Sequence, residues 1–447
     1  MRVWSVVLGL VLGVCAMGAL AQTKEETEGW ERAEWAVFFD RIAEAEGAEL
    51  EALDKVLLMG RAYRWRNYSD DEGVTLLMHA MSRVPETGML YSLKFRREDF
   101  ELRDHEGRTA LHHAARNPDE RVVQFLIGLV YARQADMTVT DDHGRDVLMH
   151  LFREGHGSRA VRQLFELAEI DVNRVDEDGY SSVAYAAMEC TDFRVMEVLG
   201  EHGADFERAF TDQKLRAIHL AARENMAEVA MALIREGVEV DALDAQGGTA
   251  LMWGCAHNKD PLMAPSLLKG GADPTIVNTH GLTVTHAAAM GGQNASVLEQ
   301  LLEAGAPVDP VVEGQPTLSP ARLYARYGDD PGVWGVIGAR GADLNRKGAE
   351  ESPMVMVAME RGADVEFIGA MIDAGCDVND GYAPFKMTPL LMALAQGSPE
   401  MVEMLLDHGA DVRAVSVDGR GALEHAQRSE QLEGHEVLAR IKSMLED

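Results

Sequence analysis

The chain is short of positive charge. Its 447 residues hold 42 lysines and arginines against 74 aspartates and glutamates, which gives a formal net charge of −32 at pH 7. A surface of this sign repels phosphate backbones and anionic lipid surfaces, so nucleic acid is excluded as a partner. The charge keeps an elongated protein soluble and permits a basic partner, although such a composition also suits a solvated acidic surface with no specific electrostatic partner.

Long apolar segments are also lacking, apart from one at the start. Arg2, an apolar stretch over residues 6–15 and the small residues Ala19 and Ala21 are typical of a secretory signal peptide over residues 1–21. A retained membrane anchor is the alternative, but the stretch is shorter than the roughly 20 residues of a membrane span. We expect a cleaved signal and an exported chain, periplasmic or extracellular, that does not insert into the membrane afterwards.

Motifs of catalysis and cofactor binding are missing too. The sequence contains no Gly-x-Ser-x-Gly, no Gly-Lys-Ser/Thr and no dinucleotide fingerprint. Its 15 histidines invite a metal or catalytic interpretation, yet no cysteine or short-spaced histidine pair supports a tetrahedral metal site. The acidic turns 141–144 and 176–179 resemble fragments of a calcium loop without the closing glutamate. We therefore expect no enzyme, no cofactor and no metal.

The chain has, in contrast, an internal repeat with a period of about 33 residues. The residue that opens the first helix of each repeat, most often Thr or Ser, recurs at Thr75, Thr109, Asp146, Ser181, Arg216, Thr249, Thr283, Ser319, Ser352, Thr388 and Gly421. Thr or Ser there caps free amides, and a proline directly after it suits the first turn. Glycines such as Gly203 and Gly409 stand where the second helix ends, and Asp-x-x-Gly turns such as 104–107 reverse the chain. Each period is one helix-turn-helix unit, and we number the repeats one to eleven in this order.

These sequence motifs resemble those of the ankyrin repeat family. The resemblance is strongest at Thr388-Pro-Leu390, at the inter-helix turn 397–400, and at Gly409-Ala-Asp411. It implies an all-α solenoid of about eleven stacked repeats with short β-turn or hairpin tips. It further implies a non-enzymatic scaffold for protein–protein interaction that binds partners through its turn tips and the concave face of its inner helices. A secreted effector or enzyme inhibitor is the alternative.

The repeat sets the expected domains. After the signal, residues 22–69 form a helical capping region, and residues 70–447 form the repeat domain, whose last unit, 416–447, is a C-terminal cap. Tyr63, Trp65 and Tyr68 are either a ligand platform or aromatics that close the core. Repeats five, eight and nine are irregular, through local bends, binding features or decay. A monomer is expected.

Cysteines outside the signal stand in repeats four, six and nine, at Cys190, Cys255 and Cys376. Because helix layers pack about 8–10 Å apart, cysteines two or more layers distant do not reach disulfide distance. We expect buried thiols instead, and an intermolecular bridge is the alternative.

The partner site is expected on the turn tips and at the ends of the inner helices, seven and eight residues after each opening residue. Arginine recurs there in an otherwise acidic chain. The predicted set is Arg116, Arg153, Arg223, His257, Arg326 and Tyr327 on the helices, with His105, Arg108, Tyr180 and Leu282 on the turns. The alternative is that arginine and glutamate pair along this face for solubility, at about 0–1 kcal/mol a pair. The identity of the protein partner does not follow from these residues.

Overall fold

The repeats form helices along the whole described part of the chain. A computed structural model describes residues 69, 72–83, 97–132, 136–224, 226–315, 318–347, 351–427 and 429–446. The predicted signal peptide, and nearly all of the predicted capping region, lie outside these residues. The chain divides into two compact bodies, the first of residues 1–211 with 235–237 and the second of residues 212–234 with 238–447.

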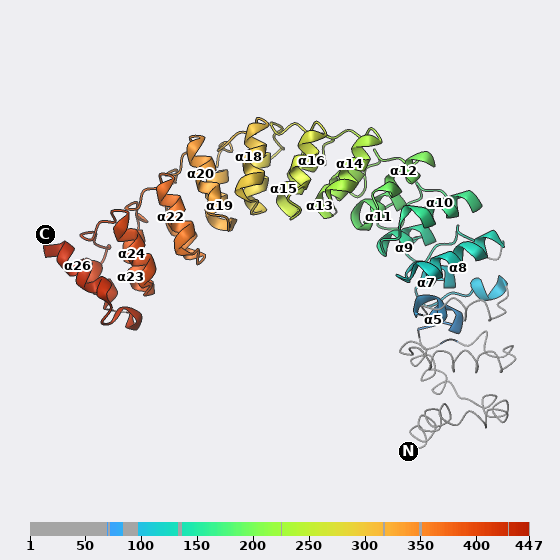
Figure 1. Ribbon diagram of the computed structural model, residues 1–447, viewed down its shortest axis with the longest axis horizontal. Helices are drawn as coiled ribbons and strands as arrows, with labels where there is room; N and C mark the ends of the chain where they lie inside the picture. Colours follow the sequence, from blue (N-terminus) through green and yellow to red (C-terminus); the bar gives the residue numbers. More distant parts are fainter. Residues whose placement is uncertain are drawn as a thin grey trace, which may run out of the picture. The chain divides into compact units, whose positions relative to one another are not determined.

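In the described residues, each repeat from the second to the eleventh contributes a first helix and a second helix, and in each body these lie in two separate rows (Figure 1). The first helices are α5 (Leu76–Arg83), α7 (Ala110–Ala115), α9 (Val147–Arg153), α11 (Ser182–Glu189), α13 (Ala217–Glu224), α15 (Ala250–His257), α17 (Val284–Met290), α19 (Pro320–Tyr327), α21 (Met354–Glu360), α23 (Pro389–Gln396) and α25 (Ala422–Ala426). The second helices are α8 (Glu120–Tyr131), α10 (Ser158–Leu167), α12 (Arg194–Glu201), α14 (Ala227–Arg235), α16 (Met263–Lys269), α18 (Ala295–Glu303), α20 (Gly332–Ala339), α22 (Val365–Asp373), α24 (Pro399–Asp407) and α26 (Glu436–Glu446). Two short 3-10 turns, η2 (Arg97–Phe100) and η3 (Glu430–Leu432), complete the described helices.

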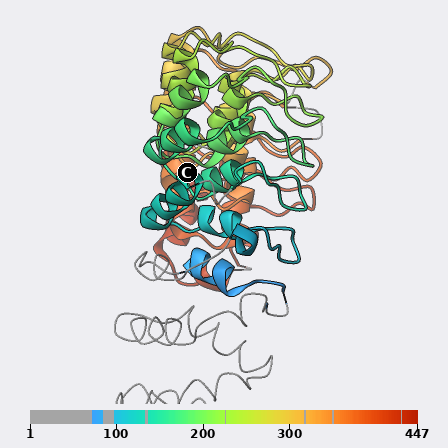
Figure 2. The same ribbon diagram turned by 90° about the vertical axis from the view of Figure 1, so that its right-hand side faces the viewer.

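The turns between repeats project from one side of the helices in each body (Figure 2). Extended backbone in the described residues is limited to isolated antiparallel bridges, such as Thr140 with Asp146 and Val175 with Ser181. The predicted all-α solenoid of stacked repeats is therefore confirmed. Within the described residues, no helix is both long enough and apolar enough to cross a membrane.

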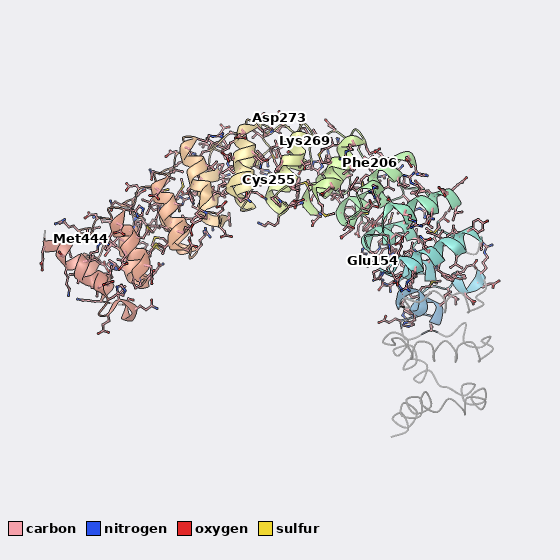
Figure 3. All side chains as sticks on the ribbon, in the orientation of Figure 1. Glu154, Phe206, Cys255, Lys269, Asp273 and Met444 are labelled. Carbon is pink, nitrogen blue, oxygen red and sulfur yellow. The ribbon has the colours of Figure 1, made fainter. Side chains whose placement is uncertain are left out.

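Small residues let successive first helices pack closely. α15 packs on α13 and on α17, and Ala221, Ala222 and Ala288 at these contacts are fully buried. Gly291, directly after α17, permits the tightest approach, because a Cβ there would lie 2.1 Å from the carbonyl oxygen of Cys255. Figure 3 shows Cys255 on the row of first helices, and Lys269 and Asp273 on the opposite side, at the end of α16 and in the turn after it.

Helix boundaries follow the opening residues that the sequence marks. The Asp146 carboxylate accepts the Met149 amide at 2.9 Å, and the Thr249 hydroxyl accepts the Met252 amide at 3.3 Å. In repeat nine the cap is Pro353, one residue later than Ser352, the predicted opening residue. A proline cap contributes no side-chain hydrogen bond, so this helix begins without the anchor that Asp146 and Thr249 provide in their repeats.

Lysine replaces glycine at two of the turns. Lys214 (φ 54°) and Lys386 (φ 48°) adopt the left-handed conformation that Gly107 and Gly144 adopt in regular repeats. Non-glycine residues reach this region at a steric cost. Lys214 thus gives the irregular repeat five a strained turn.

Two aromatic residues of repeat eight, Tyr324 and Trp334, are packing residues. Tyr324 and Trp334 are both fully buried, although neither the Tyr324 hydroxyl nor the Trp334 Nε1 has a hydrogen-bond partner. The Trp334 ring meets Phe367 of repeat nine edge-on at 5.7 Å. These aromatics therefore fill the second body and do not present a binding surface.

Candidate functional site

The predicted helix-end residues lie where each first helix leaves the core. In the first body, Arg116 follows α7 and Arg153 ends α9, and both side chains are exposed. In the second body, His257 ends α15 and is exposed, whereas the residues before it, Leu251 and Cys255, are buried. We call Arg116 and Arg153 the first-body strip, and Arg223, His257, Arg326 and Tyr327 the second-body strip.

An aromatic ring joins two members of the second-body strip. The Arg223 guanidinium lies 5.6 Å from the centre of the Trp253 ring. The centre of the His257 ring lies 5.1 Å from the centre of the same Trp253 ring. The Trp253 indole N–H donates to Asp244 at 2.8 Å, which fixes the ring. A tryptophan ring that is fixed by a hydrogen bond and lies beside a cation is typical of protein-binding surfaces. Trp253 was not predicted from the sequence, because the two residues that contact its ring, Arg223 and His257, belong to different repeats.

Arg326 and Tyr327 form a second cluster on this strip. The Arg326 guanidinium lies 5.7 Å from the Tyr327 ring centre. The Tyr327 side chain is 48% exposed, and Met290 of the preceding repeat is 41% exposed. The second-body strip thus combines cations with accessible aromatic and thioether groups, which are enriched at protein interfaces.

Glutamate pairing accounts for only part of the strips. Arg223 lies 2.6 Å from the Glu224 carboxylate, as the solubility alternative expects. Arg116 and Arg153, however, make no ion pair with any acidic residue that the structure describes. Their charges therefore face solvent in the first body.

The predicted turn residues differ in accessibility. His105 is exposed, whereas the Arg108 side chain is only 13% exposed and pairs with Asp104 at 2.8 Å. Tyr180 is half-buried and packs against Phe210, with ring centres 6.1 Å apart. Leu282 of the second body is also half-buried. His105 is the best placed of the four to meet a partner, because the others already contact the turn.

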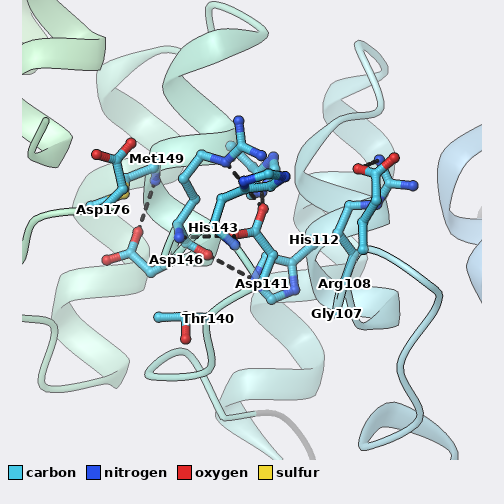
Figure 4. A network of polar contacts seen from close by, with 12 residues as sticks. Gly107, Arg108, His112, Thr140, Asp141, His143, Asp146, Met149 and Asp176 are labelled. Carbon is cyan, nitrogen blue, oxygen red and sulfur yellow. Dashed lines mark hydrogen bonds and ion pairs between the residues drawn. The ribbon is translucent and has the colours of Figure 1, made fainter. Parts of the chain in front are cut away.

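A buried carboxylate holds each regular turn in place. Asp141 accepts the amides of His143 and Arg145, each at 2.9 Å, and the His150 ring nitrogen at 3.0 Å (Figure 4). Burial alone would raise the pKa of Asp141, but the hydrogen bonds from His150 and Arg145 outweigh it and lower that pKa well below its usual value. We call this arrangement the turn clamp.

The clamp recurs with a different donor in other repeats. The residue nine positions after the turn carboxylate donates in each case: His113 to Asp104 at 2.9 Å, Tyr185 to Asp176 at 2.6 Å, and Trp253 to Asp244 at 2.8 Å. In repeat eleven, Ser416 takes the place of the aspartate and lies 3.0 Å from His425. The turn clamp orients the start of the first helix. Because the helix is rigid, the clamp also sets the position of its exposed end.

A second set of histidines links consecutive repeats. The His112 ring accepts the Thr109 amide at 3.0 Å, and its other nitrogen lies 3.2 Å from the Arg145 carbonyl of the next repeat. His219 and His286 repeat this arrangement. Burial lowers the pKa of His112 to about 3, so the ring is neutral and donates one hydrogen bond while it accepts another. His112, His219 and His286 therefore have a structural role, because each joins its repeat to the next.

Chemistry-bearing side chains elsewhere are buried or dispersed. Cys190, Cys255 and Cys376 are buried and form no disulfide with one another, and burial raises the pKa of their thiols to about 11, 12 and 12. In the part of the chain that the structure describes, no three His, Cys, Asp or Glu residues gather as a metal site would require. The exposed strips are therefore the candidate site, and they favour non-covalent recognition.

Known proteins share this repeat. A family model described as ankyrin repeats (3 copies) matches residues 77–176 and 355–445. The chain is 23% identical over 288 residues to the E3 ubiquitin-protein ligase KEG of Arabidopsis thaliana, a match that covers 62% of this chain and 18% of that protein. It is 27% identical over 259 residues to a B-cell lymphoma 3 protein homolog of Mus musculus, covering 57% of this chain and 42% of that protein.

Among solved structures, the chain is similar to the human ASB11 ankyrin repeat domain. The match has a TM-score of 0.41 at 23% sequence identity and covers 50% of this chain and 96% of that domain. The chain spans less than half the length of either sequence relative. What is shared is the repeat itself.

Proposed function

Because this chain belongs to the ankyrin repeat family, we propose that it is a non-enzymatic scaffold that binds a protein partner through the strips of its two bodies. The observation that carries the proposal is the change from buried to exposed along the first helices. In α15, Leu251 and Cys255 are buried and Trp253 is half-buried, whereas His257, the last residue of the helix, is exposed. The same change occurs in α7 and α9, where Arg116 and Arg153 end buried helices.

The chemistry of the strips suggests the kind of partner. Arginine, tryptophan and tyrosine are the side chains that most often dominate the free energy of protein binding. Here Arg223 lies over Trp253, and Arg326 lies over Tyr327. Since the chain as a whole carries a net charge of −32, these arginines are local sites for acidic groups on the partner.

Reversing the strip charges tests the proposal. Wild-type chain and the triple variant Arg116→Glu, Arg153→Glu and Arg223→Glu are used to capture partners from an envelope fraction, with identification by mass spectrometry. A partner retained by the wild type is expected to bind the variant at least about tenfold more weakly, because each lost contact is replaced by repulsion. If the captured partner is an enzyme that the chain inhibits in proportion to dose, the scaffold acts as an inhibitor.

A matched control separates the strips from overall charge. The variant Arg159→Glu, Arg340→Glu and Arg413→Glu changes the net charge equally at three exposed positions away from the strips. It is expected to retain the partner. Equal loss of the partner from both triple variants, with both folded by circular dichroism, would contradict the proposal.

We also propose that the chain is exported to the periplasm or the extracellular space. Residues 1–21 support this through their basic start, apolar stretch and small residues before Gln22. Amino-terminal sequencing of the protein from the fractionated host is expected to begin at Gln22. A protein that retains Met1 in the cytoplasmic fraction would refute export.

A further inference from the structure

A groove opens between α19 and α21 in the second body. Its volume is about 580 Å³, which is the size of a site for a small ligand or a few side chains of a peptide. Leu318, Leu323 and Val357 give it an apolar lining, and Arg322 and Arg326 bring two guanidinium groups to it.

The Arg322 guanidinium is incompletely paired. The side chain is only 17% exposed, and its Nη1 is buried without a hydrogen-bond partner. Its Nη2 lies 3.5 Å from the Glu351 carboxylate, which is too long for a good hydrogen bond. A buried cation with unused donors is costly, and an added acceptor would recover that cost.

The other charges of the groove are already used. Arg361 donates to the Ala325 carbonyl at 2.9 Å and to Asp329 at 3.1 Å, and these hydrogen bonds fix its side chain at the edge of the groove. Glu360 accepts the Ser352 hydroxyl at 3.2 Å. The unused donors in the groove therefore belong to Arg322, with Arg326 exposed beside it.

We propose that this groove binds the carboxylate of a single glutamate or aspartate in an extended segment of a partner protein. Arg322 Nη1 donates to the carboxylate, Arg326 adds its charge at the mouth, and Leu323 and Val357 contact apolar neighbours of the bound residue. A monoanion suits the groove better than a dianion, because Glu351 and Glu360 line the same space and repel a second negative charge. The inference rests on the proposed function, since it assigns the chemistry of the partner.

A pair of short peptides tests the groove on the full-length chain. The probes are acetyl-ALELA-amide and acetyl-ALQLA-amide, titrated while the arginine Nε–H resonances are followed by NMR. The glutamate peptide is expected to bind saturably, to shift the Arg322 resonance, and to bind about tenfold more tightly than the glutamine peptide. Equal affinity of the two peptides would overturn the proposal, as would tighter binding of inorganic phosphate at the same resonance.

Two variants with opposite expectations keep the test decisive. Arg322→Gln is expected to reduce the affinity for the glutamate peptide about tenfold, and Glu351→Gln to increase it severalfold by removing the internal competitor. Arg340→Gln, exposed on α20, is the charge-matched control and is expected to bind as the wild type does. If Arg322→Gln does not fold, Glu351→Gln decides the result, and an unchanged affinity overturns the proposal.

Failure of the groove and failure of the strips give different results. The groove variants alter Arg322 and Glu351, neither of which belongs to a strip. Loss of peptide binding with retained partner capture would refute the groove alone. Retained peptide binding with no partner lost on strip reversal would refute the strips alone.

Discussion

Repeats two to four of the first body and repeats eight and nine of the second differ at the turn before the first helix. In the former, a buried aspartate accepts backbone amides and a ring or hydroxyl donor from the first helix, as Asp104 and Asp141 do. No aspartate stands at the equivalent position of repeats eight and nine. Buried polar atoms without a partner occur in both regions, as His150 Nδ1 and the Tyr324 hydroxyl show, but in repeat eight one of them, Arg322 Nη1, belongs to a cation.

Removing the clamp should have the largest effect. Asp141→Ala is expected to lower the free energy of unfolding by about 2–4 kcal/mol, because four donors lose a buried acceptor. Urea denaturation, with hydrogen exchange at the 141–150 segment, measures the loss. Asp142→Ala, at the exposed neighbour, is the control, and a similar loss in both variants would show that the clamp does not stabilise the turn.

A second carboxylate of the regular repeats, that of Asp146, is expected to destabilise the folded state when it is ionised. Asp146 is buried as a helix cap, and burial, only partly offset by the Met149 amide, raises its pKa to about 6. The unfolded value is about 3.9, so the folded state binds the proton more tightly and loses about 2–3 kcal/mol of stability as the pH rises from 4 to 6.

The variant Asp146→Thr tests this sign. Threonine caps the equivalent helix at Thr249, so the hydrogen bond is kept while the buried charge is removed. The variant is expected to exceed the wild type by about 2 kcal/mol at pH 7.5 and to match it near pH 4. Asp364→Thr, the same substitution at an exposed cap, is the control. A constant difference between Asp146→Thr and wild type at both pH values would refute the assignment.

Two tyrosine-to-phenylalanine changes give the smallest and most direct contrast. Tyr185→Phe removes a 2.6 Å hydrogen bond to Asp176 and is expected to destabilise the first body by about 1–2 kcal/mol. Tyr324→Phe removes a fully buried hydroxyl without a partner and is expected to stabilise the second body by about 1 kcal/mol. Thermal unfolding of both variants measures the signs, and the same sign for both would erase the distinction between the regions.

The repeat, its caps and its stops were predictable because they depend on neighbours in the sequence. Thr388 caps α23 and Gly409 takes a positive φ after α24, as their positions imply. Exposure at the helix ends was less predictable. Asn117, one position after Arg116, is buried and donates to the Met81 carbonyl of the preceding repeat at 2.9 Å, so a column of the repeat does not by itself determine what faces solvent.

Side-chain contacts between two repeats could not be predicted from the sequence. The placing of Trp253 depends on Arg223 of the preceding repeat, and the incomplete pairing of Arg322 depends on Glu351 of the following one. Such pairs are separated by about one repeat, and no local pattern marks them. The charge of Arg322 is visible in the sequence, whereas its burial is not.

The three buried thiols make the chain its own reporter of local opening. Cys190 belongs to the first body, and Cys255 and Cys376 to the second. Since only an exposed thiolate reacts, a thiol reagent modifies each cysteine at a rate set by how often its own repeat opens. The order in which the three react would therefore rank the repeats by local stability, without any introduced label.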